Sequence, residues 1–256
     1  IDSATTYQYI ETGDGSGYGT VDISATDANK ISLKVGTGSY APVKASTLHR
    51  YASSGGETYA AYADVTDILQ SWNLASGKQT FTVANLTTNE GREGSPGLFG
   101  GWSLVIIYLQ DFNGTPRNIS VYNGFDIVAN PSTAIPITGF KLPISGTVRA
   151  QIGIFSGEGE ALYSPDSISM SGDGVSYDPM PNDGSFDSNN VFDAKLTGID
   201  RDIDPDDTNV FSINNTGVDV DAFDVSTLVT GYRDTNPAID TMYIRWSSGG
   251  DYITPS

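Results

Sequence analysis

The stretch Gly100–Val128, GGWSLVIIYLQDFNGTPRNISVYNGFDIV, decides how this chain folds. It contains the longest uninterrupted apolar run of the sequence, Leu104–Leu109. That run is too short for a membrane span, which needs about 20 apolar residues. Because it is rich in β-branched and aromatic residues and is bounded by turn residues, it predicts a buried central strand.

A turn and a second strand are expected directly after this run. Asn113-Gly114 can supply positive φ, and Pro116 interrupts the ladder of hydrogen bonds. The apolar residues of Ile119–Phe125 then indicate a second strand, with Asn123-Gly124 as a bend or bulge. We therefore predict a hairpin of two core strands at the centre of the protein.

The composition favours an all-β protein. The chain has 256 residues, 29 of them glycine, and its apolar segments are short, which is more typical of strands and turns than of helices. Its net charge of −18 argues against nucleic acid and anionic lipid as partners, because both would repel it. The same charge favours divalent cations and solubility in salty surroundings.

The absence of cysteine narrows the chemistry further. It excludes disulfides, thiolate metal sites and a cysteine nucleophile. A cysteine-free chain rich in Asp, Thr, Ser and Gly is typical of extracellular and cell-surface β proteins of bacteria and archaea. The sequence shows neither a secretory signal nor a transmembrane segment, so we expect no membrane insertion. Because it begins at Ile1, we expect a processed protein or an excerpt of a longer one.

Other segments complete the expected architecture. Helical spacing of apolar residues predicts a short helix within Tyr59–Trp72, capped by Asp64 or Thr66, and another at Asp224–Val229. The proline-containing segment Ala129–Pro136 is the best domain boundary. Further strands are expected at Thr5–Ile10, Val21–Ala25, Lys30–Val35, Ser46–Tyr51, Thr80–Leu86, Thr147–Phe155, Ser167–Met170, Val218–Phe223 and Thr241–Trp246.

The two halves of the sequence repeat several motifs in the same order. The spacing from Ile31-Ser32-Leu33 to Pro42 recurs from Ile168-Ser169-Met170 to Pro179. Further matches join Asp64-Val65-Thr66 to Asp224-Val225-Ser226, Thr80–Val83 to Thr241–Ile244, and Tyr9–Gly15 to Gly153–Gly159. The alternative is that all strands of such proteins share Thr, Tyr and Ile patterns.

We therefore predict two tandem, duplicated antiparallel β-sandwich domains of jelly-roll type, with one short helix each. The first spans residues 1–135. The second spans residues 136–256, carries an Asp-rich insertion and lacks its last core strand, since only Gly249–Ile253 matches the start of Gly100–Val128. A sandwich that lacks a core strand leaves backbone groups unpaired. A later segment, a first-domain strand or another subunit must then supply the strand.

The motifs ADVTDIL (residues 63–69), GGWSLVIIYL (100–109) and VYNGFDIV (121–128) resemble a β-sandwich domain of large secreted and cell-surface proteins of bacteria and archaea, some of them adhesin-like. The resemblance covers most of the chain and carries over no catalytic residue. It implies an extracellular location and a further strand after Asp251-Tyr252, where this sequence departs from the pattern.

Acidic residues are the candidate metal ligands. Alternating carboxylates between Asp200 and Asp207 can supply hard oxygen ligands to calcium, although Pro205 and Phe211 stand where an EF-hand needs Gly and Glu. Asp219 and Asp221 share a strand face and form a second candidate. The alternative for the segment between Asp200 and Asp207 is a solvated acidic loop. The complete set of candidate ligands is Asp200, Asp202, Asp204, Asp206, Asp207, Asp219 and Asp221.

Catalytic chemistry finds little support. His49 is the sole histidine, and no nucleophile elbow accompanies it. Glu158 and Glu160 are paired turn acids without surrounding aromatic residues, and the tryptophans lie in predicted elements, where core positions are expected.

Two functions therefore remain open. The first is a non-catalytic structural or adhesive protein of a cell-surface filament, surface layer or adhesin, with other copies of itself or adjacent β domains as partners and strand donation as the contact. The alternative is a calcium-dependent module that binds proteins or host or environmental glycans.

Overall fold

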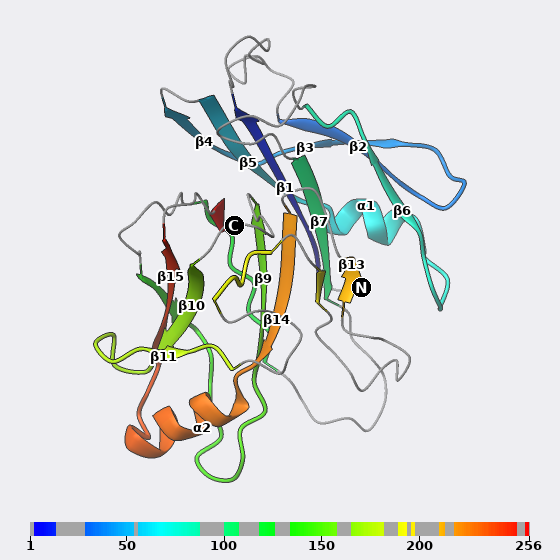
Figure 1. The fold of residues 1–256 in the computed structure, drawn as a ribbon. Coiled ribbons are helices and arrows are strands. Elements are labelled where there is room, and N and C mark those ends of the chain that lie inside the picture. Colours follow the sequence, from blue (N-terminus) through cyan, green and yellow to red (C-terminus); the bar gives the residue numbers. More distant parts are fainter. Residues whose placement is uncertain are drawn as a thin grey trace. The chain divides into compact units, whose positions relative to one another are not determined.

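The computed structural model describes residues 3–13, 29–53, 56–87, 100–107, 118–125, 134–157, 165–181, 189–193, 196–197, 210–212, 218–249 and 254–255. The described chain is β-rich, as the composition predicts, with two helices (Figure 1). It forms two compact units, Ile1–Gly114 and Thr115–Pro255. Because the Tyr122 hydroxyl donates a hydrogen bond to the Thr138 carbonyl, the segment Asn118–Phe125 belongs with the second unit.

The first unit contains two antiparallel sheets and the short helix α1 (Thr66–Ser71). One sheet has the order β4 (Thr47–Ser53), β5 (Gly56–Asp64), β1 (Ser3–Gly13) and β7 (Gly100–Ile107). The other has the order β3 (Ala41–Lys44), β2 (Lys30–Val35) and β6 (Phe81–Ala84). Leu33 of β2 and Leu69 of α1 are fully buried in one cluster, against which Leu104 of β7 packs. Both sheets and the helix therefore enclose one core.

The second unit has a similar plan. One sheet has the order β13 (Val210–Ser212), β12 (Leu196–Thr197), β14 (Val218–Asp224), β9 (Gln151–Gly157) and β16 (Thr254–Pro255). The other has the order β11 (Asp178–Pro179), β10 (Asp166–Ser171), β15 (Thr241–Ser248) and β8 (Ala134–Thr138). Among the pairs of named strands described, only β12 with β14 is parallel. Helix α2 (Ser226–Thr235) follows β14 directly (Figure 1).

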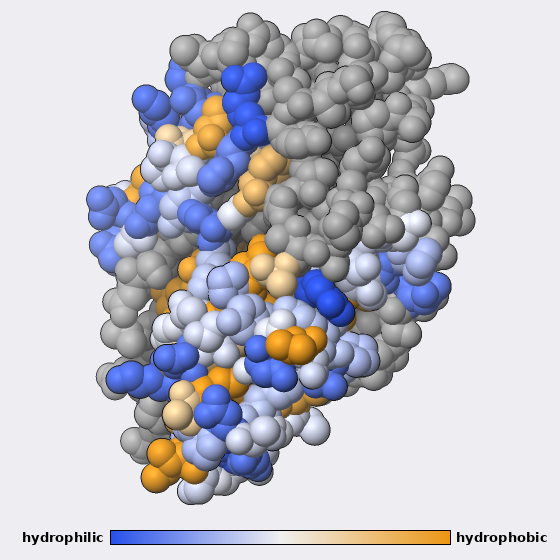
Figure 2. Space-filling view, turned by 90° about the vertical axis from the view of Figure 1, so that its left-hand side faces the viewer, coloured by the Kyte–Doolittle hydropathy of each residue, from blue (hydrophilic) through white to orange (hydrophobic). Residues whose placement is uncertain are grey.

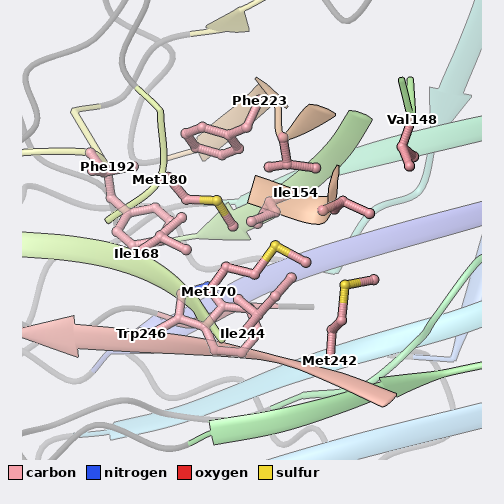
Figure 3. Close-up of a cluster of buried hydrophobic side chains, with 13 residues drawn as sticks. Val148, Ile154, Ile168, Met170, Met180, Phe192, Phe223, Met242, Ile244 and Trp246 are labelled. Carbon is pink, nitrogen blue, oxygen red and sulfur yellow. The ribbon is translucent and has the colours of Figure 1, made fainter. Parts of the chain in front are cut away.

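The core of the second unit lies between its two sheets. Phe223 and Ile154 come from β14 and β9, whereas Met170, Ile244 and Trp246 come from β10 and β15, and their side chains face one another (Figure 3). Val191 and Phe192, between β11 and β12, are also buried in this cluster.

Strand pairing follows the same register in both units. Ser32 lies opposite Pro42 between β2 and β3, and Ser169 lies opposite Pro179 between β10 and β11. The matched pairs Leu33–Val83 and Met170–Ile244 join β2 to β6 and β10 to β15. In the other sheets, the order β5-β1-β7 corresponds to β14-β9-β16. Three of the four repeated motifs therefore take similar places in the pairing, whereas Tyr9 lies opposite Ala60 and its sequence match Gly153 lies opposite Ala222, two residues out of register.

Both helices begin in the same way. The Asp64 carboxylate accepts a hydrogen bond from the Thr66 backbone N–H at 2.8 Å, and Asp224 accepts one from the Ser226 N–H at 2.9 Å. A carboxylate at this position satisfies an N–H group that has no partner inside the helix. Val65, which follows Asp64, is fully buried, and its counterpart Val225 is 1% exposed. Both predicted helices are confirmed, although α2 is longer than expected.

Two predictions about the stretch Gly100–Val128 are wrong. Among the described strands, β7 lies at the edge of its sheet instead of at the centre, and its residues after Gly100 are half-buried. Within the described residues, Asn118–Phe125 forms no strand, and Ile119 is 57% exposed. A β-forming composition makes a strand only where a neighbouring edge is available to pair with it.

The predicted linker Ala129–Pro136 is partly a strand. Its last residues enter β8, which pairs antiparallel with β15. In the described part of the chain β8 is the last strand of its sheet, and proline is tolerated in edge strands because it has no N–H group to donate. The predicted strand Val21–Ala25 and the turn Asn113-Gly114 lie outside the described residues.

Candidate functional site: the edge of strand β9

Among the described strands, β9 has a partner along its whole length on one side only. On that side it pairs with β14 from Gln151 to Gly157. On the other side β16 pairs with Gly157 and Ser156 alone. In the part of the chain that the structure describes, no strand pairs with Gln151–Ile154 on this second side. In an antiparallel sheet every second residue of such an edge directs its N–H and C=O groups outward.

The first unit shows what occupies the corresponding edge there. Thr5 of β1 lies opposite Asp64, as Gln151 of β9 lies opposite Asp224. On the other side of β1, strand β7 pairs with it over eight residues, from Ser3–Ile107 to Ile10–Gly100. The pair Ser156–Pro255 occupies the place of Ile10–Gly100. Strand β16 therefore covers only the start of the position that β7 fills.

The side chains of this edge separate into two faces. Ile154 is buried and Ile152 is half-buried, and both pack in the core. Gln151 and Gly153 are exposed. A strand added beside β9 would therefore lie over the rim of the core and could bury apolar side chains opposite Ile152 and Ile154.

A strand-forming segment without a sheet lies in the same unit. Asn118–Phe125 has the sequence NISVYNGF, and Ile119 and Val121 are 57% and 39% exposed. On the face shown in Figure 2, the described apolar residues form small patches among polar ones. Alternating β-branched residues that are exposed in this way are typical of a segment that pairs with an edge strand.

The predicted metal ligands Asp219 and Asp221 are buried in β14, at 0% and 1% exposure. They alternate with Val220 and share a face with Phe223, which lies in the core. They therefore point into the unit, where their counterparts in β5 are Tyr59 and Ala61. Buried carboxylates require hydrogen bonds or positive charge around them.

The other predicted metal ligands, Asp200, Asp202, Asp204, Asp206 and Asp207, lie outside the described residues. Among the described residues, no group of three His, Asp or Glu side chains could hold a metal ion. Asp224 is exposed and serves the start of α2, as expected. Of the predicted ligands, the structure thus describes only Asp219 and Asp221, and both lie buried in β14.

Sequence reasoning missed another buried aspartate, Asp166, which is 2% exposed. Its Oδ1 accepts hydrogen bonds from the backbone N–H groups of Val191 and Phe192. Asp166 thereby attaches the segment that contains Phe192 to strand β10, and the side chain of Phe192 lies in the core. A single Asp at a strand start gives no sequence signal for such a role.

The structure describes some of the residues that the sequence offered for catalysis. His49 is exposed on β4. Trp246 is buried in the core, Trp72 packs against the core of the first unit, and Trp102 is half-buried. The turn acids Glu158 and Glu160 lie outside the described residues. In the described part, neither helix is long and apolar enough to cross a membrane.

Comparison with protein-family models, curated proteins and solved structures finds no match to this chain. The fold and the edge of β9 therefore have to be interpreted from their own geometry.

Proposed function

We propose that this protein is a non-catalytic structural or adhesive component of a cell surface, as a subunit or module of a filament, surface layer or adhesin. Its two units are duplicated β-sandwiches, and the second is completed by a strand from another copy or an adjacent β domain. The observation that carries the proposal is the edge Gln151–Ile154, which β16 does not reach although the corresponding edge of β1 is covered by β7.

Physical chemistry supports this function. An edge strand with unpaired backbone groups beside a core rim binds an incoming strand through main-chain hydrogen bonds, and apolar side chains add affinity. The net charge of −18 and the absence of cysteine suit an extracellular protein in salty surroundings. The shared helix starts and pairing registers support duplication, because independent sheets would have no reason to repeat them.

The experiment supplies the missing strand within the chain. The sequence of Trp102–Ile107 is fused directly after Ser256, where the correspondence of Pro255 to Gly100 places it in register with β9. We expect wild-type protein to form fibres or sheets in negative-stain microscopy, with and without EDTA. The fusion should remain monomeric and unfold at a higher temperature, because its own strand fills the edge.

The matched control carries the same fusion with Asp in place of the residues that correspond to Leu104 and Ile106, whose side chains pack on the core of the first unit. It should assemble like wild type and gain no thermal stability. A wild-type protein that stays monodisperse at all concentrations, with a fusion that leaves its unfolding temperature unchanged, would exclude the proposal.

The calcium-dependent binding module is the second proposal. Two carboxylates, Asp219 and Asp221, face the interior of the second unit where the first has Tyr59 and Ala61. A calcium ion held by them and by oxygen atoms of the Asp-rich insertion would offset their charge. Such an ion would order the insertion, and a glycan or protein surface would then bind there.

A further inference from the structure

We propose that Asn118–Phe125 of one copy is the strand that completes β9 of a second copy. This inference rests on the proposed strand addition and names its donor, its register and its partner, a second copy of this chain. The donor has eight residues, and β7 pairs with β1 over the same number.

The donor has the chemistry that the edge requires. Ile119 and Val121 are β-branched, stand two residues apart and are both exposed. In a strand they project to the same face. On the edge, Ile152 and Ile154 also stand two residues apart and face the core. Pairing therefore places the exposed Ile119 and Val121 beside Ile154 and Ile152 at the rim of the core, and the exposed Ser120 and Gly153 face solvent together.

The register follows from this match. In an antiparallel pair, Ile119 opposite Ile154 places Ser120 opposite Gly153 and Val121 opposite Ile152. A shift by two residues places Arg117 or Asn123 over the core rim, and a shift by one places Ser120 there. A polar side chain at the rim would lose water without gaining an apolar contact. The first register is the one that the side chains favour.

The position of the donor within its own unit favours pairing with β9 of a second copy. The hydrogen bond from the Tyr122 hydroxyl to the Thr138 carbonyl places the donor beside β8. Strand β8 ends the sheet β11-β10-β15-β8, whereas β9 belongs to the other sheet of the unit. The donor therefore stands at a different sheet from the edge of its own copy. Each copy offers one donor and one edge, which permits either a closed pair or an open chain of copies.

The first test removes the apolar face of the donor. Ile119→Asp with Val121→Asp should weaken self-association roughly a hundredfold, because two buried apolar side chains become charged. The matched control is Ile144→Asp with Val175→Asp, at positions that are 97% and 82% exposed outside the donor and the edge. It should associate like wild type in sedimentation velocity. Equal association of both double variants would overturn the inference.

The second test reads the register directly. The chain has no cysteine, so Ser120→Cys and Gly153→Cys variants, mixed and oxidised, can form only the intended bonds and homodisulfides. We expect the mixed disulfide, which joins the peptide from the Ser120→Cys variant to the peptide from the Gly153→Cys variant, to dominate in mass spectrometry. A mixture of Asn118→Cys and Gly153→Cys, two residues out of register, should yield several-fold less. Equal yields from the two mixtures would also overturn the inference.

The outcomes separate this inference from the proposed function. If the Trp102–Ile107 fusion prevents assembly while Ile119→Asp with Val121→Asp does not, the edge accepts another donor and only this inference fails. If the fusion has no effect on assembly or stability, strand addition itself fails, and the donor assignment fails with it.

Discussion

Asp64 and Asp224 hold equivalent positions in the two units. Each is the last residue of a strand, and they lie opposite Thr5 of β1 and Gln151 of β9. Each also accepts a hydrogen bond from the backbone N–H two residues later. Each also precedes a valine buried beneath the helix. The junction between strand and helix is therefore built in the same way in both units: an aspartate bonds the first turn of the helix, and the valine after it is buried.

Replacing either aspartate should destabilise its unit. Asp64→Ala or Asp224→Ala removes the acceptor for a first-turn N–H, so each should lower the free energy of unfolding by about 1 kcal/mol. Asn retains the acceptor oxygen, so Asp64→Asn and Asp224→Asn should lose less than half as much. Urea-induced unfolding followed by circular dichroism measures both series. Equal losses for Ala and Asn would show that the hydrogen bond does not contribute.

Sequence patterns predicted the helix starts and most strands because those depend on neighbouring residues. Asp64 and Thr66 are two positions apart, and alternation within Val218–Phe223 is visible in the sequence alone. Strand order depends on distant pairing, so the edge position of β7 and the pairing of β8 with β15 could not be predicted in this way. The apolar run Leu104–Leu109 has the same composition whether its strand is central or marginal.

The candidate edge could be predicted only in part. The short match at Gly249–Ile253 indicated that a strand was missing, but the register that identifies Gln151–Ile154 requires the pairing of β9 with β14. The exposure of Ile119 depends equally on tertiary structure, since its sequence favours a paired strand. The alternation of β14 predicts that Asp219 and Asp221 share a strand face, but their burial depends on the packing of that face in the folded unit.

Acid should unfold the second unit partly through Asp173. Its carboxylate accepts hydrogen bonds from the Ser176 and Val175 N–H groups, both at 2.8 Å, and from the Ser171 hydroxyl, and these hold the pKa of Asp173 below its ordinary value of 3.8. A lowered pKa in the folded state gives stability that is complete above the ordinary value and is lost as the pH falls through the folded one.

The corresponding test uses Asp173→Asn, which cannot ionise. The unfolding temperature of wild type should fall more steeply than that of the variant between about pH 4 and about pH 2. Differential scanning calorimetry across this range compares the two slopes. Parallel curves would mean that Asp173 titrates alike in the folded and unfolded chains.

Arg233 should be the most sensitive charged residue of α2. Its side chain is buried, and Nη1 donates hydrogen bonds to the carbonyls of Pro143 and Gly146 at 3.2 and 2.6 Å. Arg233→Ala should cost about 2–4 kcal/mol of unfolding free energy, because two hydrogen bonds from a charged donor and the packing of a buried side chain are lost. The unfolding free energy of Arg233→Lys should lie between those of wild type and Arg233→Ala, since an ammonium group cannot reproduce the planar set of donors of a guanidinium group.

The salt bridge of Arg233 provides the control. Asp234 accepts from Nη2 at 2.7 Å, but its side chain is 62% exposed. Asp234→Ala should therefore cost less than about 1 kcal/mol in the same urea titration. A loss as large as that of Arg233→Ala would assign the stability to the ion pair instead of the two carbonyls.

Calcium should stabilise the protein if Asp219 and Asp221 help to hold it. An ion at a hundred times its dissociation constant adds about 2.7 kcal/mol, so calcium should raise the unfolding temperature and EDTA should lower it. Asp219→Asn with Asp221→Asn should abolish this response, while the exposed Asp224→Asn keeps it. An equal calcium response in both variants would place the ion elsewhere or attribute the effect to the net charge.

Two glycines near one tyrosine should respond in opposite directions to the same substitution. A Cβ atom on Gly172 would lie 2.7 Å from Cγ of Tyr232, whereas one on Gly231 would meet nothing within 4 Å. The Tyr232 ring cannot retreat without loss, because its hydroxyl donates to the Met170 carbonyl and lies 2.9 Å from Oδ2 of Asp178. Burial, followed by that carboxylate, raises the pKa of Tyr232 and keeps the hydroxyl protonated as a donor.

Gly172→Ala should therefore destabilise the protein by about 1–3 kcal/mol through overpacking. Gly231→Ala lies inside α2 and should stabilise it by about 0.5–1 kcal/mol, because alanine loses less backbone entropy in a helix. Urea titration of both variants decides the comparison. Adding Tyr232→Phe to Gly172→Ala frees the ring from its two acceptors, so the clash should then cost less than it does with Tyr232 in place. An undiminished cost would show that the ring is held by packing and not by its hydroxyl.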